Sequence, residues 1–175
     1  CLYSINYVFF YLSNTYLISA FPAVVFSTVV IMNILGETFY FKKRPSLQTL
    51  IGATIGMAGI IIIFNNEIFN FSLTNGAHIG LLLALFGTFS ASTGNMVYQR
   101  NLNNEFPLIE TLAYAMLYGS LITFLIAKIR GAELLFEYSF AYIASLAYLS
   151  IIGSIFAFIF YLKLIEKVGP GRAGY

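Results

Sequence analysis

Five long apolar stretches, separated by short polar connections, run along the chain. A hydrocarbon core about 30 Å thick needs about 20 apolar residues of helix to cross it. The pattern therefore predicts five complete membrane-spanning helices, at residues 16–41, 47–64, 79–98, 108–129 and 141–162. Residues 1–12 are also apolar but too few to span. Because no initiator Met precedes them, we expect this stretch to be the end of a helix in a fragment of a longer protein.

Basic residues are distributed unevenly over the polar connections. If successive helices alternate in direction, one side collects Lys42, Lys43, Arg44, Arg100, Lys163, Lys167 and Arg172. The other side collects only Lys128 and Arg130. The positive-inside rule makes the first side cytoplasmic and places the 65–78 loop and the 130–140 connection outside.

Composition narrows the class of protein. Of the 175 residues, 59% are hydrophobic and 9% are charged, against roughly 25% charged in a soluble domain. Such a chain would expose large apolar patches in water, which excludes a soluble enzyme. The single cysteine excludes a disulfide scaffold. The lack of Asp excludes EF-hands and Ser-His-Asp triads. The net charge of +2 argues against nucleic-acid binding. The prediction is an all-α, polytopic transmembrane helical bundle.

Neutral polar residues inside the predicted spans are the candidates for a substrate cavity, because polar groups in a bilayer need partners or a wet cavity. The candidates are Ser27, Thr28, Asn33, Asn95, Tyr114, Tyr118 and Ser154. Asn33 and Asn95 are preferred, since an amide has more hydrogen-bonding groups to satisfy than a hydroxyl. Interhelical hydrogen bonding for stability is the alternative. A cavity role predicts that Asn95→Leu impairs transport while folding stays near wild type.

Glu37 and His78 are titratable residues, and each has a functional and a structural interpretation. Glu37 could couple transport to protons, but we favour an interfacial carboxylate paired with Lys42, Lys43 or Arg44. His78 has no Cys or carboxylate partner at ligand spacing and predicts no metal site. No cofactor is expected.

Small residues recur at helical spacing in three predicted spans. They are Gly52, Gly56 and Gly59, then Gly80, Gly87 and Gly94, then Gly153 and Ala157. Small residues let helix backbones approach closely in a membrane. They could form a moving seam or a dimer face, but plain helix packing is the favoured interpretation.

Local patterns resemble a known family. They are Gly153-Ser154 with Phe160-Tyr161-Leu162 and the run 165–173, Leu50-Ile51-Gly52-Ala53 with Gly56 and Gly59, Gly80-Leu81-Leu82 through Ser90-Ala91-Ser92 to Gln99-Arg100, and Ala23 to Thr28. With these the chain resembles the EamA-like branch of the drug/metabolite transporter superfamily. One departure is that Gly36-Glu37 lies six residues further from Gly52 than the family's Gly-Glu, so we transfer no family role to Glu37.

The resemblance implies a ten-helix fold of two inverted five-helix repeats. Residues 1–64 would then hold the end of helix three with helices four and five, 65–78 an external loop, and 79–175 helices six to eight. It also implies a multi-pass protein of the plasma membrane that moves a small organic metabolite by alternating access.

Other function classes remain open at this stage. A non-transporting receptor or assembly subunit has the same helix content. An integral membrane enzyme would need a nucleophile, metal cluster or acid–base pair at membrane depth, which these residue types do not supply. The expected partners are a small-molecule substrate and the lipid bilayer, with no nucleic acid, and the oligomeric state is left open.

Overall fold

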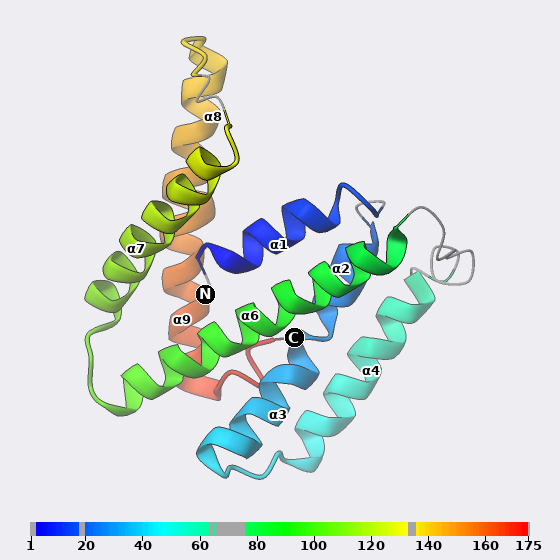
Figure 1. The fold of residues 1–175 in the computed structure, drawn as a ribbon. Helices are drawn as coiled ribbons and strands as arrows, with labels where there is room; N and C mark the ends of the chain where they lie inside the picture. The colour runs from blue at the N-terminus through cyan, green and yellow to red at the C-terminus, as the bar shows by residue number, and fades with distance from the viewer. Residues whose placement is uncertain (1–2, 18–19, 64, 66–75, 133–135, 175) are drawn as a thin grey trace.

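Helices account for the regular structure of the chain (Figure 1). The computed structural model describes residues 3–17, 20–63, 65, 76–132 and 136–174. Within these residues there is no strand, and the predicted all-α fold is confirmed. The elements are α1 (Ile5–Ser13), α2 (Ala20–Ser27), α3 (Val29–Phe41), α4 (Leu47–Ile63), α6 (Ala77–Asn103), α7 (Leu108–Ile129), α8 (Phe140–Ser150), the π-helical turn η1 (Ile151–Phe156) and α9 (Ala157–Val168).

Four helical stretches in the described residues are long and apolar enough to cross a membrane. They are Ala20–Phe41, Ala77–Asn103, Leu108–Ile129 and Phe140–Val168. The fifth predicted span is a shorter apolar helix, Leu47–Ile63, with 17 residues, at the lower end of the range of about 17–25 that spans a bilayer. Most of the predicted 65–78 loop lies outside the described residues.

The first long span is divided into α2 and α3 at Thr28, which the apolar pattern did not reveal. The Ser27 hydroxyl donates to the Val24 carbonyl oxygen at 2.5 Å, and the Thr28 hydroxyl donates to that of Val25 at 2.6 Å. Hydroxyls that bond back to the preceding turn bend helices. These two predicted cavity residues therefore mark the break between the two helices.

The last long span contains a π-helical turn between α8 and α9. Within η1 the Ser154 hydroxyl donates to the carbonyl oxygen of Leu149, five residues earlier, at 3.0 Å. Turns of this kind occur frequently at functional sites. An unbroken apolar run carries no signal for a widened turn, so the sequence predicted an ordinary helix here.

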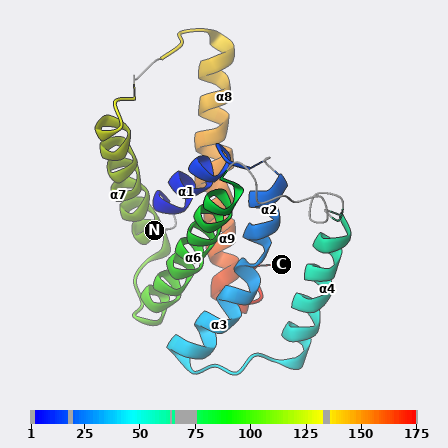
Figure 2. The ribbon, with the colours of Figure 1, turned by 45° about the vertical axis from the view of Figure 1, so that its right-hand side comes forward.

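Helix α6 lies across the middle of the molecule and packs against α1, α2 and α3 (Figures 1 and 2). Two of its glycines make the approach possible. A Cβ at Gly80 would lie 2.7 Å from Leu17 Cγ, and one at Gly87 would lie 3.2 Å from the Asn6 carbonyl oxygen. The Ser13 hydroxyl also donates to the Gly80 carbonyl oxygen at 2.8 Å. Gly80 and Gly87 thus serve close helix packing within the chain.

The Gly87→Ala substitution is expected to lower the free energy of unfolding by about 1–2 kcal/mol, as overpacking does. The reason is that the neighbouring carbonyl oxygen of Asn6 belongs to the backbone of α1 and cannot rotate away. Gly56→Ala is the matched control, since a Cβ at Gly56 meets nothing within 4 Å. Thermal unfolding in detergent measures both. Equal midpoints for the two variants would contradict the tight α1–α6 crossing.

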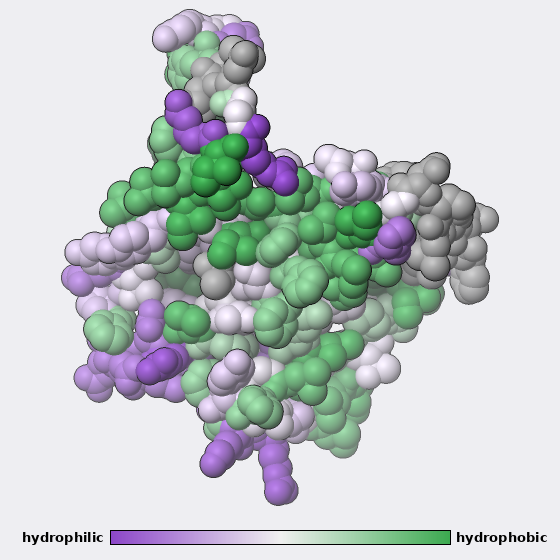
Figure 3. All heavy atoms as spheres, viewed as in Figure 1, coloured by the Kyte–Doolittle hydropathy of each residue, from purple (hydrophilic) through white to green (hydrophobic). Residues whose placement is uncertain are grey.

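The outer surface of the bundle is largely apolar. Figure 3 shows hydrophobic residues across the middle of the visible face and hydrophilic ones in clusters at its lower left, at its lower edge and at the base of the upper projection. Helix α8 has no buried residue, and large side chains such as Ile55, Leu121 and Phe140 are exposed. This distribution suits hydrocarbon or further helices rather than water.

Candidate functional site

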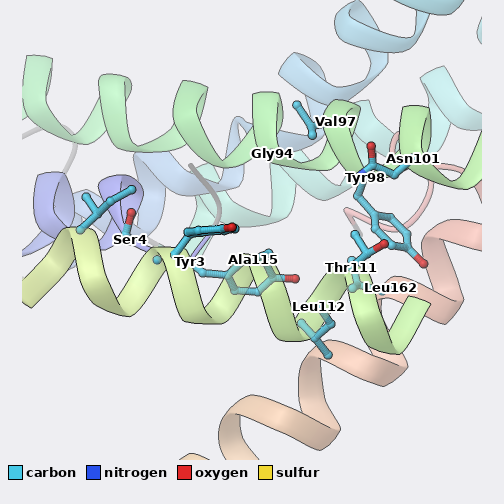
Figure 4. A pocket seen from close by; sticks show the side chains of 13 residues that line it. Tyr3, Ser4, Gly94, Val97, Tyr98, Asn101, Thr111, Leu112, Ala115 and Leu162 are labelled. Atoms are coloured by element: carbon cyan, nitrogen blue, oxygen red, sulfur yellow. The ribbon is translucent and has the colours of Figure 1, made fainter. Parts of the chain in front are cut away.

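A cavity of about 200 Å³ lies between the start of α1 and helices α6, α7 and α9 (Figure 4). Its walls consist of Tyr3, Ser4, Gly94, Val97, Tyr98, Asn101, Thr111, Leu112, Ala115, Tyr118, Gly119, Ile122 and Leu162. The lack of a side chain at Gly119 lets the turn before α1 pack closely against α7, because a Cβ there would lie 2.9 Å from the Tyr3 carbonyl oxygen. We call this space the tyrosine cavity.

The lining of the tyrosine cavity is neutral and aromatic. Tyrosines from the turn before α1, from α6 and from α7 contribute to it, together with hydroxyl and amide side chains, and none of the lining residues is charged. The hydroxyls of Ser4 and Tyr98 are buried without a hydrogen-bond partner in the part of the chain that the structure describes. Buried polar groups are normally bonded to protein or water. These two hydroxyls belong to residues of the cavity wall but are themselves closed to water in this conformation.

A second hollow of about 380 Å³ lies between α1, α7 and η1. Its walls are Tyr3, Tyr7, Met116, Ser120, Ser150, Ser154, Ile155 and Phe158. Tyr3 lines both spaces, and its ring packs edge-on against Phe158 with the ring centroids 4.7 Å apart. The π-helical turn therefore contributes directly to a largely apolar space, with three serines in its wall, next to the tyrosine cavity.

The two predicted asparagines lie together in the interior. Asn33 of α3 is 0% exposed and Asn95 of α6 is 1% exposed. The Asn95 amide donates to Asn33 Oδ1 at 3.3 Å, and the Asn33 amide donates to the Pro170 carbonyl oxygen at 3.1 Å. Neither residue is part of the lining of the tyrosine cavity. Their bonds join α3, α6 and the loop after α9, which accords with interhelical hydrogen bonding.

Glu37 lies one turn beyond Asn33 on α3 and reaches the same loop. Its Oε2 accepts a hydrogen bond from the Gly171 backbone N–H at 3.2 Å. Lys43, one of the partners expected from the sequence, attracts the carboxylate, and so does Arg172. The geometry gives Glu37 a backbone partner 134 residues away, and its pairing with Lys42, Lys43 or Arg44 stays a prediction.

Comparison with known families identifies the chain. The model of the EamA-like transporter family matches residues 78–175, more than half of the chain. The chain belongs to the EamA-like transporter family. Neither the curated proteins nor the solved structures contain a match to it.

The family match confirms the resemblance drawn from the sequence. Together with the apolar helices it makes the chain a multi-pass membrane protein of a transporter family. The matched region contains α6, α7, α8 and α9, which form most of the two hollows.

The structure divides the predicted site residues of this EamA-like protein among four places. Tyr118 lines the tyrosine cavity. The Tyr114 ring stacks on the Tyr118 ring, with the two ring centroids 6.4 Å apart. Ser154 lines the second hollow. Asn33 and Asn95 form the buried pair, and Ser27 and Thr28 lie at the break between α2 and α3.

Several lining residues were not predicted from the sequence. Tyr3, Ser4 and Tyr98 lie at or near the ends of apolar stretches, where tyrosine and serine are ordinary interfacial residues. One available signal was the spacing of Gly94 and Tyr98, which puts a small and a large residue on one face of α6. Tyr3 and Ser4 could not be found in this way, because their contacts depend on how α1 crosses α7.

Proposed function

We propose that this EamA-like protein is a secondary transporter that moves a small organic metabolite across the membrane by alternating access. The observation that carries the proposal is the tyrosine cavity, an uncharged and largely apolar space with a few hydroxyl and amide groups, between helices of the apolar bundle. Transporter sites lie near the bilayer midplane between bundles of helices, and rocking of the bundles exposes the site to each side in turn. The contribution of Tyr118 and Ala115 from the interior of α7 supports such a position for the cavity.

The chemistry of the lining favours a neutral, zwitterionic or partly apolar solute. Tyrosine rings offer apolar faces for stacking, and hydroxyl and amide groups offer hydrogen bonds that fix orientation. A polyanion would meet no cation among the lining residues. The volume of about 200 Å³ is below the range of roughly 300–1,000 Å³ typical of drug-sized ligands. A compact metabolite fits this space better than a drug-sized molecule does.

The plasma membrane is the proposed location, with the basic connections in the cytoplasm. One contact supports placing two of these connections on the same side of the membrane. Arg172 Nη2 donates to Ser46 Oγ at 2.9 Å, which brings the segment after α9 next to the segment before α4. The alternation of sides inferred from the basic residues requires this arrangement.

Flux measurements with the full-length protein in proteoliposomes test the proposed function. The panel consists of labelled neutral amino acids, nucleosides, hexoses and polyols, with protein-free liposomes as the control. We expect at least one compound to enter faster with protein present and to show counterflow when the vesicles are preloaded with it. A receptor, an assembly subunit or an enzyme would give no substrate-dependent flux with any compound, and that result would refute the transporter proposal.

A further inference from the structure

The loop that follows α9 meets the junction between α3 and α4 at the end of the molecule that carries the basic residues. Glu37 from α3 accepts the Gly171 backbone N–H at 3.2 Å. Arg172 donates through Nε to Thr49 Oγ1 at 3.0 Å and through Nη2 to Ser46 Oγ at 2.9 Å. These contacts join parts of the chain more than 120 residues apart.

Two glycines fit the loop to the Glu37 carboxylate. Gly169 has φ +84°, and a Cβ there would lie 2.6 Å from Glu37 Oε1. A Cβ at Gly171 would collide with Glu37 Oε2. Any larger residue at either position would push the carboxylate away, so the close approach of carboxylate and loop depends on both glycines.

Arg172 binds the residue that caps α4. Ser46 Oγ accepts the Thr49 backbone N–H at 3.2 Å, as an N-cap side chain does, and lies 2.8 Å from Thr49 Oγ1. The guanidinium therefore holds the first turn of α4 through hydroxyl groups. Further along α4 a Cβ at Gly56 or Gly59 would meet nothing within 4 Å, and in Figure 2 the helix stands at the outside of the bundle. Arg172 is thus a principal tie between α4 and the loop.

We call the contacts of Glu37 with Gly171 and of Arg172 with Ser46 and Thr49 the seam. These contacts are polar and lie beside a hollow of about 310 Å³. Lys43, Arg44, Glu166 and Lys167 line the hollow together with Glu37 and Arg172. Water can replace each of these hydrogen bonds when the two sides separate. The neighbouring apolar cluster of Tyr98, Leu112, Leu162 and Ile165 has no such substitute partner. The seam is therefore the part of this end of the bundle that can open and close at the least loss of interaction.

We propose that Glu37 and Arg172 form a latch, in which the 169–172 loop closes the basic side of the transport path against the α3–α4 junction and releases it once in each cycle. The proposal rests on the transport function proposed above and adds the gate. In it Glu37 positions the loop, and Arg172 makes the separable contact with the start of α4.

Cross-linking tests whether the latch must open. Ser46→Cys and Arg172→Cys are combined in full-length protein without other cysteines and treated with a short bifunctional thiol reagent that is cleaved by reductant. We expect solute flux to fall about tenfold on cross-linking and to recover on reduction, as with other gates that limit turnover. The two single variants, treated alike, are the controls, and in each of them we expect the reagent to leave flux at the level of the same variant before treatment. Unchanged flux in a fully cross-linked sample would overturn the latch.

Hydrogen exchange tests the contact without any transport measurement. In Glu37→Ala we expect the Gly171 amide to exchange about tenfold faster, because its acceptor is lost and local opening is easier. Glu110→Ala, which removes an exposed carboxylate from the first turn of α7, should leave the exchange unchanged. If Glu37→Ala does not fold, Glu37→Gln takes its place; it keeps an acceptor oxygen but loses the charge that strengthens the bond, so we expect a smaller acceleration, of about threefold. Equal exchange in the Glu37 and Glu110 variants would overturn the latch, whereas absence of flux in untreated protein would overturn the proposed function.

Discussion

The Asn33→Leu substitution is expected to lower the free energy of unfolding by about 3 kcal/mol, as when a buried hydrogen-bonding group is left without its partner. The Asn33 side chain is fully buried and bonds two other segments. Leucine would leave the Pro170 carbonyl oxygen and the Asn95 amide without these bonds in an environment closed to water. Denaturant or thermal unfolding of the purified full-length protein measures the loss.

Two further variants make this result specific. Asn95→Leu leaves the bond between Asn33 and Pro170 intact and removes the bonds of Asn95 to Asn33 Oδ1 and to Tyr161. We therefore expect a smaller loss, on the order of 1–2 kcal/mol. Asn104→Leu, at an exposed position after α6, should stay within about 0.5 kcal/mol of wild type. Wild-type stability in Asn33→Leu would contradict the buried network. Wild-type stability with lost flux in Asn95→Leu would instead favour the cavity role that the sequence suggested for that residue.

The Ala115→Phe substitution is expected to reduce solute flux by about tenfold or more, since each loss of about 1.4 kcal/mol in binding is a factor of ten. Ala115 is part of the cavity wall on α7, facing the α6 wall that contains Gly94 and Tyr98 (Figure 4). A phenyl ring there would occupy much of a space of about 200 Å³. Initial rates of uptake into proteoliposomes, with the solute found in the panel, measure the effect.

Ala113→Phe is the matched control on the same helix. Ala113 is exposed in the structure and lies outside the lining of the tyrosine cavity. The same added volume at this position should leave both flux and the amount of folded protein close to wild type. If Ala115→Phe transports as fast as Ala113→Phe, the tyrosine cavity does not lie on the solute path.

Much of the helical layout could be predicted from the sequence, because bilayer thickness sets a minimum length for a membrane-spanning helix. The polar clusters after Phe41 and Tyr98 and the proline at 107 indicated where helices end and begin, and the described helices begin and end close to these positions. Helix α6 continues to Asn103, beyond the predicted end at 98, because its last turn is polar rather than apolar.

The contacts that shape the site could not be predicted, because they join residues far apart in the sequence. Glu37 was given partners among the adjacent basic residues, and nothing local indicated Gly171 as its hydrogen-bond donor. Asn33 and Asn95 were chosen for their amides, but only the packing of α3 on α6 shows that they bond to each other. The glycines of α4 and α6 follow the same spacing rule, yet Gly87 is tightly packed and Gly56 is open.

Site-directed thiol labelling tests the central claim, that the tyrosine cavity lies on the solute path and is exposed to water during the cycle. Ala115→Cys is placed in full-length protein without other cysteines, with Ala113→Cys as the control, and both are treated with a membrane-impermeant thiol reagent in proteoliposomes. The account predicts that Ala115→Cys is labelled from the aqueous side and that the transported solute slows its labelling by about tenfold at saturating concentration. The labelling of Ala113→Cys should not respond to solute. Failure of Ala115→Cys to react, or reaction at a rate that solute does not change, would contradict the account.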